Sequence, residues 1–457
     1  MKKQIPVVKN TDYDVTIEDL SYQGLGVAKI DNFPIFIENA LPGEEVKIKV
    51  IKTKSSFAFG KVVAFKTTSP NRVELVDKAY TQTGIATLQH LAYPAQLEFK
   101  QHQVAMDFHK LGLDVEVEPT LGMDDPTHYR NKAQVPVRLI NGRLETGFYR
   151  KHSHDLVPIE DFYIQDKEID KAIIVVRDLL RTFHVAPYDE VHHKGVVRNI
   201  MVRRGYYSHQ MMIVLVTRAK KIPHAEEIVA GILAKLPEVK SVIQNVNSAK
   251  TNALMGPVNN VLAGADVITD TLLGLNFAIS ATSFYQVNPV QTEKLYQLAI
   301  DKAELKKDDV VVDAYCGIGT ISLAVAQHVK KVYGVEIVDQ AVEDAKHNAK
   351  LNNIRNVDFV AAKAEEQMAK WQSDGLKPDV VFVDPPRKGL DSTLIDSVAE
   401  MNPKKVVYVS CNPATLARDV QLFAEKGYQV NQPIQPVDQF PQTIHVESVT
   451  VLERTTD

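Results

Sequence analysis

The sequence predicts a multidomain α/β protein made of an N-terminal OB-type β-barrel, a central α+β domain and a C-terminal Rossmann-like domain. Short strand-like segments separated by Gly and Pro fill residues 13–66. Strands and helices then mix from 129 to about 260, and from about 308 apolar strands alternate with amphipathic helices. The domain boundaries that we expect are 1–67, 68–275 and 276–457.

The first domain is predicted from five short segments: "YDVTIEDL", "GVAKI", "FPIFIENA", "EEVKIKVIKT" and "FAFGKVVAF". They are divided by the turn-like stretches "QGLG", "DN" and "LPGE". Segments of this kind are typical of a small barrel, and OB-type barrels commonly bind single-stranded nucleic acid. A β-module used only for packing is the alternative.

The middle of the chain begins with a helix and has an excess of basic residues. Apolar residues at helical spacing in "YPAQLEFKQHQVAMDFHKLG" predict a helix over about 92–112, and this helix is a candidate to pack on the third domain. Residues 130–221 hold 17 Lys plus Arg against 10 Asp plus Glu, in a chain of formal net charge −4. This excess predicts either a nucleic-acid-binding surface or an ordinary solvated face.

The composition, 45% hydrophobic and 24% charged, is that of an ordinary globular protein. Two cysteines exclude a disulfide framework and a four-thiolate metal site, so we expect no metal and a reducing, cytoplasmic setting. No stretch approaches the roughly 18 apolar residues of a membrane span. The start, "MKKQIPVVKN", lacks the apolar run of a signal peptide, and no obligate protein partner is evident.

A glycine-containing turn predicts a cofactor site. In "VVVDAYCGIGTISLA", Gly317 and Gly319 follow an apolar strand and precede a helix, but Ser322 replaces the third glycine of a dinucleotide motif. The next strand ends in Glu336, 17 residues after Gly319, where a carboxylate can accept hydrogen bonds from ribose hydroxyls. The pattern favours S-adenosylmethionine, and a dinucleotide-dependent oxidoreductase is the alternative.

A later strand ends in "DPPRKG", which begins with Asp384. The two prolines stiffen the turn that carries this carboxylate. Asp384 can accept a hydrogen bond from a base N–H, and Arg387 can reach a phosphate or a carbonyl oxygen. N-methylating enzymes use a related loop with an aromatic residue at the fourth position, where this sequence has Arg387. This difference argues against an N-methyltransferase, which is a further alternative.

The stretch "VVYVSCNPATLARDV" places Cys411 between a strand and a helix that begins near Pro413. A helix N-terminus predicts a lowered thiol pKa and a nucleophilic thiolate, and an inert core cysteine is the alternative. Cys316 lies inside the glycine motif and is predicted to pack. Glu447, two residues after His445, can serve as a general base if the site around it is partly dry.

Taken together, these motifs resemble the bacterial RNA uracil-5 methyltransferases. The resemblance rests on "SFYQVN", "DAYCGIGT", "DPPRKG", "VSCNPATLARD" and "HVES", while "YQGLGVAKIDNFPIFIENALPGEEV" resembles the TRAM domain, an OB-type RNA-binding barrel. It implies that Cys411 is the nucleophile and Glu447 the base, and that Phe284 or Tyr285 stacks on a flipped uracil. The cofactor-binding residues that we expect are Gln286, Tyr315, Gly317, Gly319, Glu336 and Asp384, and the substrate-binding residues are Phe284, Gln286, Asp384 and Arg387.

One departure from the family pattern concerns an iron–sulfur cluster. Many ribosomal-RNA members hold a cluster on four cysteines, whose positions correspond here to Asp77, Thr83, Ala86 and Phe162. We therefore expect no cluster. The resemblance is then to the Gram-positive branch that modifies 23S ribosomal RNA, which is the RNA partner that we expect.

Transfer RNA is the alternative substrate, although transfer-RNA members generally lack the barrel. A non-catalytic RNA-binding protein on a methyltransferase scaffold is the alternative from another class. The joint presence of Cys411, Glu447 and Asp384 argues against it.

Overall fold

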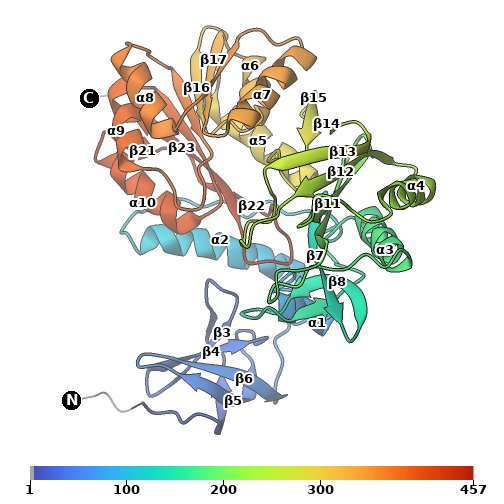
Figure 1. Cartoon of the computed structure of the whole chain (residues 1–457). Helices are drawn as coiled ribbons and strands as arrows, with labels where there is room; N and C mark the ends of the chain where they lie inside the picture. Colours follow the sequence, from blue (N-terminus) through green and yellow to red (C-terminus); the bar gives the residue numbers. More distant parts are fainter. Residues whose placement is uncertain (1–4, 456–457) are drawn as a thin grey trace.

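The computed structural model describes residues 5–455; residues 1–4 and 456–457, which belong to the expected first and third domains, lie outside the described part. The described chain contains sheets of six, seven, two and eight strands. Figure 1 shows the six-stranded N-terminal sheet as a separate blue body below the rest of the chain. None of the helices in residues 5–455 is long and apolar enough to cross a membrane.

The N-terminal sheet curls around a small apolar core. Its strand order is β1-β5-β6-β4-β3-β2, and inward residues such as Ile35, Ile37, Ile48 and Val50 are fully buried. Alternation of buried and exposed residues along β4 and β5 is what a sheet with one buried face requires. The strands are β1 (Asp12–Thr16), β2 (Asp19–Leu20), β3 (Gly26–Ile30), β4 (Phe33–Glu38), β5 (Glu45–Thr53) and β6 (Ala58–Phe65).

The central sheet has the order β13-β12-β11-β10-β7-β8-β9 and is mainly antiparallel, with β11 and β12 parallel. Helices α3 and α4 pack side by side against it (Figure 1). The elements are α1 (Lys78–Thr83), β7 (Lys132–Ile140), β8 (Arg143–Tyr149), β9 (Leu156–Pro158), α3 (Lys167–Thr182), β10 (Val197–Arg204), β11 (Met211–Thr217), α4 (Ala225–Lys235), β12 (Val239–Val246) and β13 (Val258–Gly264).

The C-terminal sheet has the order β18-β17-β16-β19-β20-β23-β21, with β18 to β20 parallel and β23 antiparallel. The chain reverses direction across the sheet between β16 and β19, and open α/β sheets bind ligands at the carboxyl ends of strands beside such a switch. The strands are β16 (Val310–Ala314), β17 (Lys331–Glu336), β18 (Val357–Ala361), β19 (Val380–Val383), β20 (Lys405–Ser410), β21 (Tyr428–Val430), β22 (Gln435–Val437) and β23 (Glu447–Arg454).

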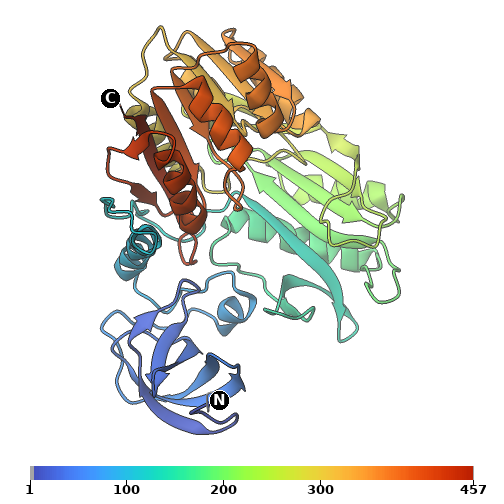
Figure 2. The same cartoon turned by 90° about the vertical axis from the view of Figure 1, so that its left-hand side faces the viewer.

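Two apolar clusters lie on opposite faces of this sheet. Val311 points to the cluster that contains α5, α6 and α7, and Val312 points to the cluster that contains α8, α9 and α10. The near-continuous valine runs of these strands are explained by this double burial. Figure 2 shows helices at the orange-red to red end of the chain in front of the strands. The helices are α5 (Pro289–Ala303), α6 (Thr320–Ala326), α7 (Asp339–Leu351), α8 (Ala364–Ser373), α9 (Ser392–Met401) and α10 (Pro413–Ala424).

Two early segments pack on the C-terminal sheet. Helix α2 (Tyr93–His109) buries Val104 and Phe108 in the same cluster as α10, as expected for the helix predicted over 92–112. The hairpin of β14 (Val267–Leu272) and β15 (Leu275–Ser280) packs in a cluster shared by the central and C-terminal sheets. The boundary expected after residue 275 falls inside this hairpin, and the domain boundaries stay predictions.

Candidate active site

The predicted site residues meet at one edge of the C-terminal sheet. Gly317 follows β16, Glu336 ends β17, Asp384 follows β19 and Cys411 follows β20. Glu447 begins β23, which runs antiparallel to β20, so its amino end lies at the same edge. The four parallel strands and the antiparallel β23 therefore bring together, at one edge of the sheet, five residues that are far apart in the sequence.

A cavity beside the glycine turn has the features that a nucleoside needs. It is lined by Phe284, Gly317, Glu336 and the start of α7. The Glu336 carboxylate accepts hydrogen bonds from the backbone N–H groups of Gly317 (3.2 Å) and Val338 (3.0 Å), and each oxygen retains a free lone pair. Gly317 has φ 54°, and a Cβ there would meet no atom within 4 Å, so the backbone stays open to a ligand.

The two aromatic residues proposed to stack on a base lie in different environments. Tyr285 is only 3% exposed and packs in the apolar core, so it cannot stack on a substrate. Phe284 is 67% exposed and lines the cavity that contains Glu336. It therefore lies on the side predicted for the cofactor, and its stacking on uracil stays a prediction.

The remaining cofactor candidates do not line this cavity. Tyr315 adopts φ 73° and packs against the cluster of α8, α9 and α10. Gly319 is the N-cap residue of α6, and a Cβ there would lie 3.2 Å from the ring of Phe359, so this glycine faces packed side chains. Gln286 is partly buried, and its side chain lies next to the hydroxyl of Tyr296. Cofactor contacts of these three residues stay predictions.

Tyr296 is a site residue that the sequence reasoning missed. Its side chain is 2% exposed, and its hydroxyl lies near Asp384, Gln286 and Thr320. Burial, followed by the Asp384 charge, raises its pKa well above the usual range. Tyr296 occupies a position of apolar periodicity on α5, so the sequence carries no signal that separates it from a core residue.

Cys411 and Glu447 are neighbours across the sheet. The register of β20 and β23 ends with Ser410 opposite Ser448, so Cys411 and Glu447 occupy the next cross-strand position. Cys411 is half-buried, and Glu447 is only 4% exposed. A carboxyl group and a thiol thus share one partly dry site.

The thiol pKa differs from the sequence-based expectation. Burial raises the pKa of Cys411 to about 12, the negative charges of Glu447 and Asp384 add to the rise, and Arg387 opposes it. The predicted lowering by α10 is therefore wrong for the free protein. Two nearby carboxyl groups and desolvation outweigh the helix N-terminus, whose Ala414 N–H is already bonded to Asn412 Oδ1 (3.2 Å).

Both carboxyl groups also favour their neutral forms. Burial raises the pKa of Asp384 to about 7. Burial and the Asp384 charge raise the pKa of Glu447 well above its ordinary value, and Arg387 opposes this shift. A general base works best when its pKa lies near the operating pH, and these environments move two carboxyl groups in that direction.

Arg387 is held over the site by its backbone while its side chain remains exposed. Asn412 Nδ2 donates to the Arg387 carbonyl (2.9 Å), which fixes the proline turn to the start of α10. The guanidinium lies 3.3 Å from the ring of His445. Burial lowers the pKa of His445 to about 4, with help from Arg387, Lys100 and Arg130, so this ring is neutral.

A groove of about 580 Å³ continues from His445 into the central domain. Arg130, Lys132 and Lys151 line it together with His445. Burial lowers the pKa of Lys132 to about 8, and Arg203 and Arg130 contribute. The basic excess of residues 130–221 thus includes a concave surface that leads toward Arg387, as an RNA backbone would require.

The barrel approaches this groove and carries an aromatic cluster on its outer face. Phe36, Phe57 and Phe59, all partly exposed, have ring centroids 5.5–6.1 Å apart. Glu38, on the same strand as Phe36, forms an ion pair of 2.9 Å with Lys151, which lines the groove. An ion pair therefore joins the barrel strand that carries Phe36 to the wall of the basic groove.

The residues at the four positions matched to cluster cysteines take part in core packing or in hydrogen bonds of helix α1. Ala86 and Phe162 are fully buried in the apolar core of the central domain. Asp77 accepts a hydrogen bond from Ala79 N (2.7 Å) at the start of α1, and Thr83 donates to the Ala79 carbonyl (2.7 Å). The expectation of no iron–sulfur cluster stays a prediction.

Comparison with known proteins gives two family matches. Residues 92–455 match the model described as "tRNA (Uracil-5-)-methyltransferase", and residues 6–63 match the TRAM domain. A Lactiplantibacillus plantarum protein named "Uncharacterized RNA methyltransferase" is 65% identical, covering 99% of this chain and 100% of its own length. A protein of the same name from Enterococcus faecalis is 54% identical over 100% of both chains.

Among solved structures, this chain is similar to the Pyrococcus abyssi tRNA (uracil-54, C5)-methyltransferase in complex with S-adenosyl-L-homocysteine. The TM-score is 0.78 at 27% sequence identity, covering 96% of this chain and 99% of that chain.

Proposed function

The chain belongs to the tRNA (uracil-5-)-methyltransferase family and carries a TRAM domain, and on this premise we propose that it methylates a uracil at C5 in 23S ribosomal RNA through Cys411. That it is an S-adenosylmethionine-dependent RNA methyltransferase follows from the family. The adjacency of Cys411 and Glu447 at the ends of β20 and β23 carries the proposed chemistry.

The cavity beside Gly317 fits the nucleoside of the methyl donor. The free lone pairs of Glu336 suit two ribose hydroxyls, and the open backbone at Gly317 allows close approach. When bound, the donor supplies an electrophilic methyl group on a sulfonium. Phe284, at the mouth of the same cavity, provides an apolar face for the adenine or for the neighbouring base.

Cys411 activates the uracil. Its thiolate bonds to C6, and the electrons of the C5–C6 double bond move onto C5 and the adjacent carbonyl as an enolate. The electrons on C5 then form its bond to the methyl carbon as the bond from that carbon to the sulfonium sulfur breaks, which leaves S-adenosylhomocysteine as a neutral thioether. Glu447 removes the C5 proton, the electrons of that C–H bond restore the double bond, and the S–C6 bond breaks to release the Cys411 thiolate.

Asp384 and Arg387 have complementary roles toward the flipped base. Asp384, in its ionised form, accepts a hydrogen bond from the uracil N3–H, and Arg387 donates to a uracil carbonyl oxygen or to the neighbouring phosphate. A uracil within an RNA stack cannot reach Cys411, so the base must be extruded. Tyr296 supports Asp384 from the buried side.

The barrel and the groove bind the RNA outside the target uracil. The rings of Phe36, Phe57 and Phe59 offer stacking faces for unpaired bases, and Arg130, Lys132 and Lys151 attract the phosphate backbone. Their connection through Glu38 and Lys151 favours a single path of RNA from the barrel to Cys411.

Transfer RNA remains the second candidate substrate. The Pyrococcus abyssi protein is a tRNA (uracil-54, C5)-methyltransferase and covers 96% of this chain, so the barrel alone does not separate the two substrates. The absence of the cluster cysteines, which resembles the Gram-positive ribosomal branch, supports 23S ribosomal RNA.

A direct test maps 5-methyluridine in ribosomal and transfer RNA from a strain lacking the gene and from the same strain expressing the wild-type or the Cys411→Ala protein. We expect one or more 23S positions to lose the mark and to regain it only with the wild type. Loss of the mark in transfer RNA alone would favour the second candidate, and loss in neither RNA would contradict both.

A further inference from the structure

The loop between β22 and β23, residues 438–446, connects the RNA groove to the catalytic carboxyl group. It carries His445, which lines the groove and touches Arg387, and it ends at Glu447. Within the loop, backbone hydrogen bonds join only near neighbours, as from Thr443 N to the Phe440 carbonyl (3.2 Å). Its shape must therefore be set by contacts from other elements.

Helix α5 holds only the first two residues of this loop. Gln291 Nε2 donates to the Asp438 carbonyl (3.0 Å), and Asn288 Nδ2 donates to the Gln439 carbonyl (3.0 Å). Both bonded residues, at the start of the loop, precede Phe440 in the sequence, whereas Glu447 follows it. Another element has to hold the part of the loop nearer to Glu447.

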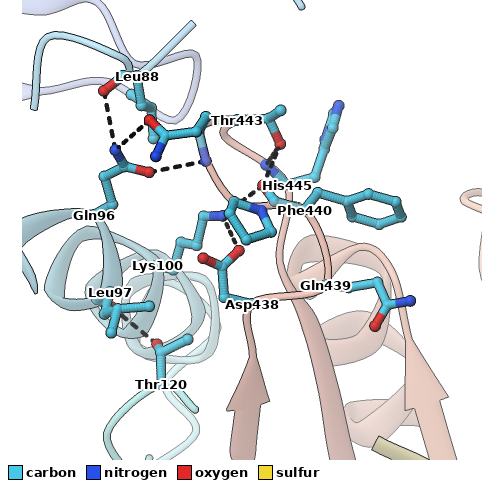
Figure 3. A network of polar contacts seen from close by, with 12 residues as sticks. Leu88, Gln96, Leu97, Lys100, Thr120, Asp438, Gln439, Phe440, Thr443 and His445 are labelled. Carbon is cyan, nitrogen blue, oxygen red and sulfur yellow. Dashed lines mark hydrogen bonds and ion pairs between the residues drawn. The ribbon is translucent and has the colours of Figure 1, made fainter. Parts of the chain in front are cut away.

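One face of α2 holds that part. Lys100 Nζ forms an ion pair with Asp438 and also donates to the Phe440 carbonyl (3.1 Å), as Figure 3 shows. Gln96 exchanges two hydrogen bonds of 3.0 Å with Gln442, one of them from the Gln442 backbone N–H. Gln96 and Lys100 lie four residues apart on the helix and so share its surface.

Tyr93 extends the same face. Its hydroxyl donates to Asp438 Oδ2 (2.9 Å), three residues before Gln96 on the helix. Leu88 N–H, just before α2, donates to the Gln442 carbonyl (2.9 Å). The loop is thus fixed to α2 at 438, 440 and 442, up to five residues before Glu447.

The Lys100–Asp438 pair has no exposed side-chain surface on either partner. Replacing a buried ion pair with uncharged groups of similar shape is often neutral or stabilising, so such a pair is weak evidence for stability alone. The Lys100 ammonium forms directional bonds to both Asp438 and the Phe440 carbonyl, and an apolar side chain could form neither. The burial of this pair beneath the catalytic loop is explained by that directional role.

We propose that Lys100 is a positioning residue for proton removal. Through Asp438 and the Phe440 carbonyl it fixes the loop that enters β23 at Glu447. The pairing of β20 and β23 brings Cys411 and Glu447 together, and the loop sets the direction in which the chain reaches Glu447, whereas Cys411 follows β20. This inference rests on the proposed function, because it assigns a partner to the base of that reaction. It predicts that loss of Lys100 affects the step that uses Glu447 more than the step that uses Cys411.

The experiment separates these two steps. RNA with 5-fluorouracil at the target position forms the Cys411 adduct and accepts the methyl group, but it has no C5 proton for Glu447 to remove. RNA with ordinary uracil requires both steps. The variants are Lys100→Met, the double variant Lys100→Met with Asp438→Asn, and Lys110→Met as the control, since Lys110 lies at the end of α2 in an exposed pair with Asp107.

In the double variant we expect turnover on uracil RNA to fall by about 10- to 100-fold, because small displacements of a catalytic group cost this much, with adduct formation on fluorinated RNA within about threefold of wild type. Methylated RNA still bound covalently should accumulate. The Lys110→Met protein should match wild type in both measurements.

Parallel loss of both activities in a folded double variant, or unchanged turnover, would overturn the inference. So would failure of the double variant to fold, since the pair would then act on stability. Failure of the wild-type protein to form any adduct on fluorinated RNA would instead refute the proposed function.

Discussion

Ser410 lies directly opposite Ser448 in the antiparallel pair of β20 and β23, and this register brings the next residues of the two strands, Cys411 and Glu447, together. A one-residue slip would turn one of the two side chains to the opposite face of the sheet. The nucleophile and base proposed here therefore depend on one strand pairing, in which neighbouring residues such as Val449 and Val451 are buried.

The Cys411→Ala variant should bind S-adenosylmethionine and transfer no methyl group, because the C6 adduct cannot form. The wild-type protein should form a covalent adduct with 5-fluorouracil RNA, which peptide mass mapping should place on the segment that contains Cys411. Cys316, only 4% exposed, is the internal control and should carry no adduct. Normal turnover in the alanine variant would exclude the mechanism.

The free thiol should be unreactive at neutral pH. With a pKa of about 12, Cys411 is almost entirely protonated at pH 8, so alkylation by iodoacetamide should be slow and should still be accelerating above pH 9. Glu447→Gln removes a negative charge and should lower the thiol pKa, which speeds alkylation at a given pH.

The positive charge of the cofactor provides a second test of how nearby charges set the pKa of Cys411. S-adenosylmethionine and S-adenosylhomocysteine have nearly the same shape, but only the former is a sulfonium cation. Alkylation should therefore be faster with S-adenosylmethionine bound than with S-adenosylhomocysteine bound, since a nearby positive charge favours the thiolate. Equal rates would place the sulfonium out of electrostatic reach of Cys411.

The Glu447→Gln variant should be defective after methyl transfer. Without a base, the C5 proton stays in place, so methylated RNA should remain attached to Cys411 and should be visible as a covalent complex on a denaturing gel. Glu453→Gln is the matched control, because Glu453 lies on the same strand but pairs with Lys405 away from the site. Rapid release by Glu447→Gln would show that another group removes the proton.

The aromatic cluster on the barrel should contribute to RNA affinity. Phe59→Ala should weaken binding of the RNA substrate by about 1–3 kcal/mol if a base stacks there, and it should leave cofactor affinity unchanged. Val63→Ala, at an exposed apolar position on the same strand, is the control. Equal RNA affinity of Phe59→Ala and wild type, measured at one salt concentration, would remove the cluster from the RNA path.

Asp170 should make the free energy of unfolding decrease as pH rises, which is opposite to the effect of an ion-paired carboxylate. Burial raises the pKa of this carboxyl to about 8, so the folded state binds the proton more tightly than the unfolded state, and stability is lost as pH rises from about 4 to about 8. Asp170→Asn keeps an acceptor for Phe162 N–H and should raise the free energy of unfolding at pH 8 by on the order of 2 kcal/mol.

The gain from Asp170→Asn should shrink toward pH 4 in thermal or urea unfolding. Asp178, on the same helix, provides a control of opposite sign, since its ion pairs with Arg177 and Arg181 lower its pKa. Asp178→Asn should give no gain at pH 8. A destabilised Asp170→Asn protein at both pH values would contradict the argument.

Local pattern was enough to predict most of the architecture. Short strands with Gly and Pro turns predicted the barrel, and valine-rich strands followed by amphipathic helices predicted the parallel sheet. Because residues at the carboxyl ends of parallel strands share one edge, the sequence also predicted that Gly317, Asp384 and Cys411 would meet. These inferences depend on period and spacing, which the sequence contains in full.

The environment of each side chain was decided by tertiary structure. The helix N-terminus next to Cys411 is a local feature and predicted a lowered thiol pKa, whereas the burial and the two carboxyl groups that raise it come from other strands. Tyr285 and Phe284 are adjacent in sequence, yet one is buried and the other lines the cavity. Tyr296 has the spacing of a core residue and joins the site only through contacts with distant residues.

The sequence by itself determined the order of the elements, the family motifs and the edge of the sheet where the chemistry gathers. Only the tertiary structure decided that Lys100 holds Asp438, 338 positions away, and thereby the loop before Glu447. The physical reason is that pKa values, burial and ion pairs depend on which surfaces are packed together, and that packing is set by long-range contacts that no local pattern encodes.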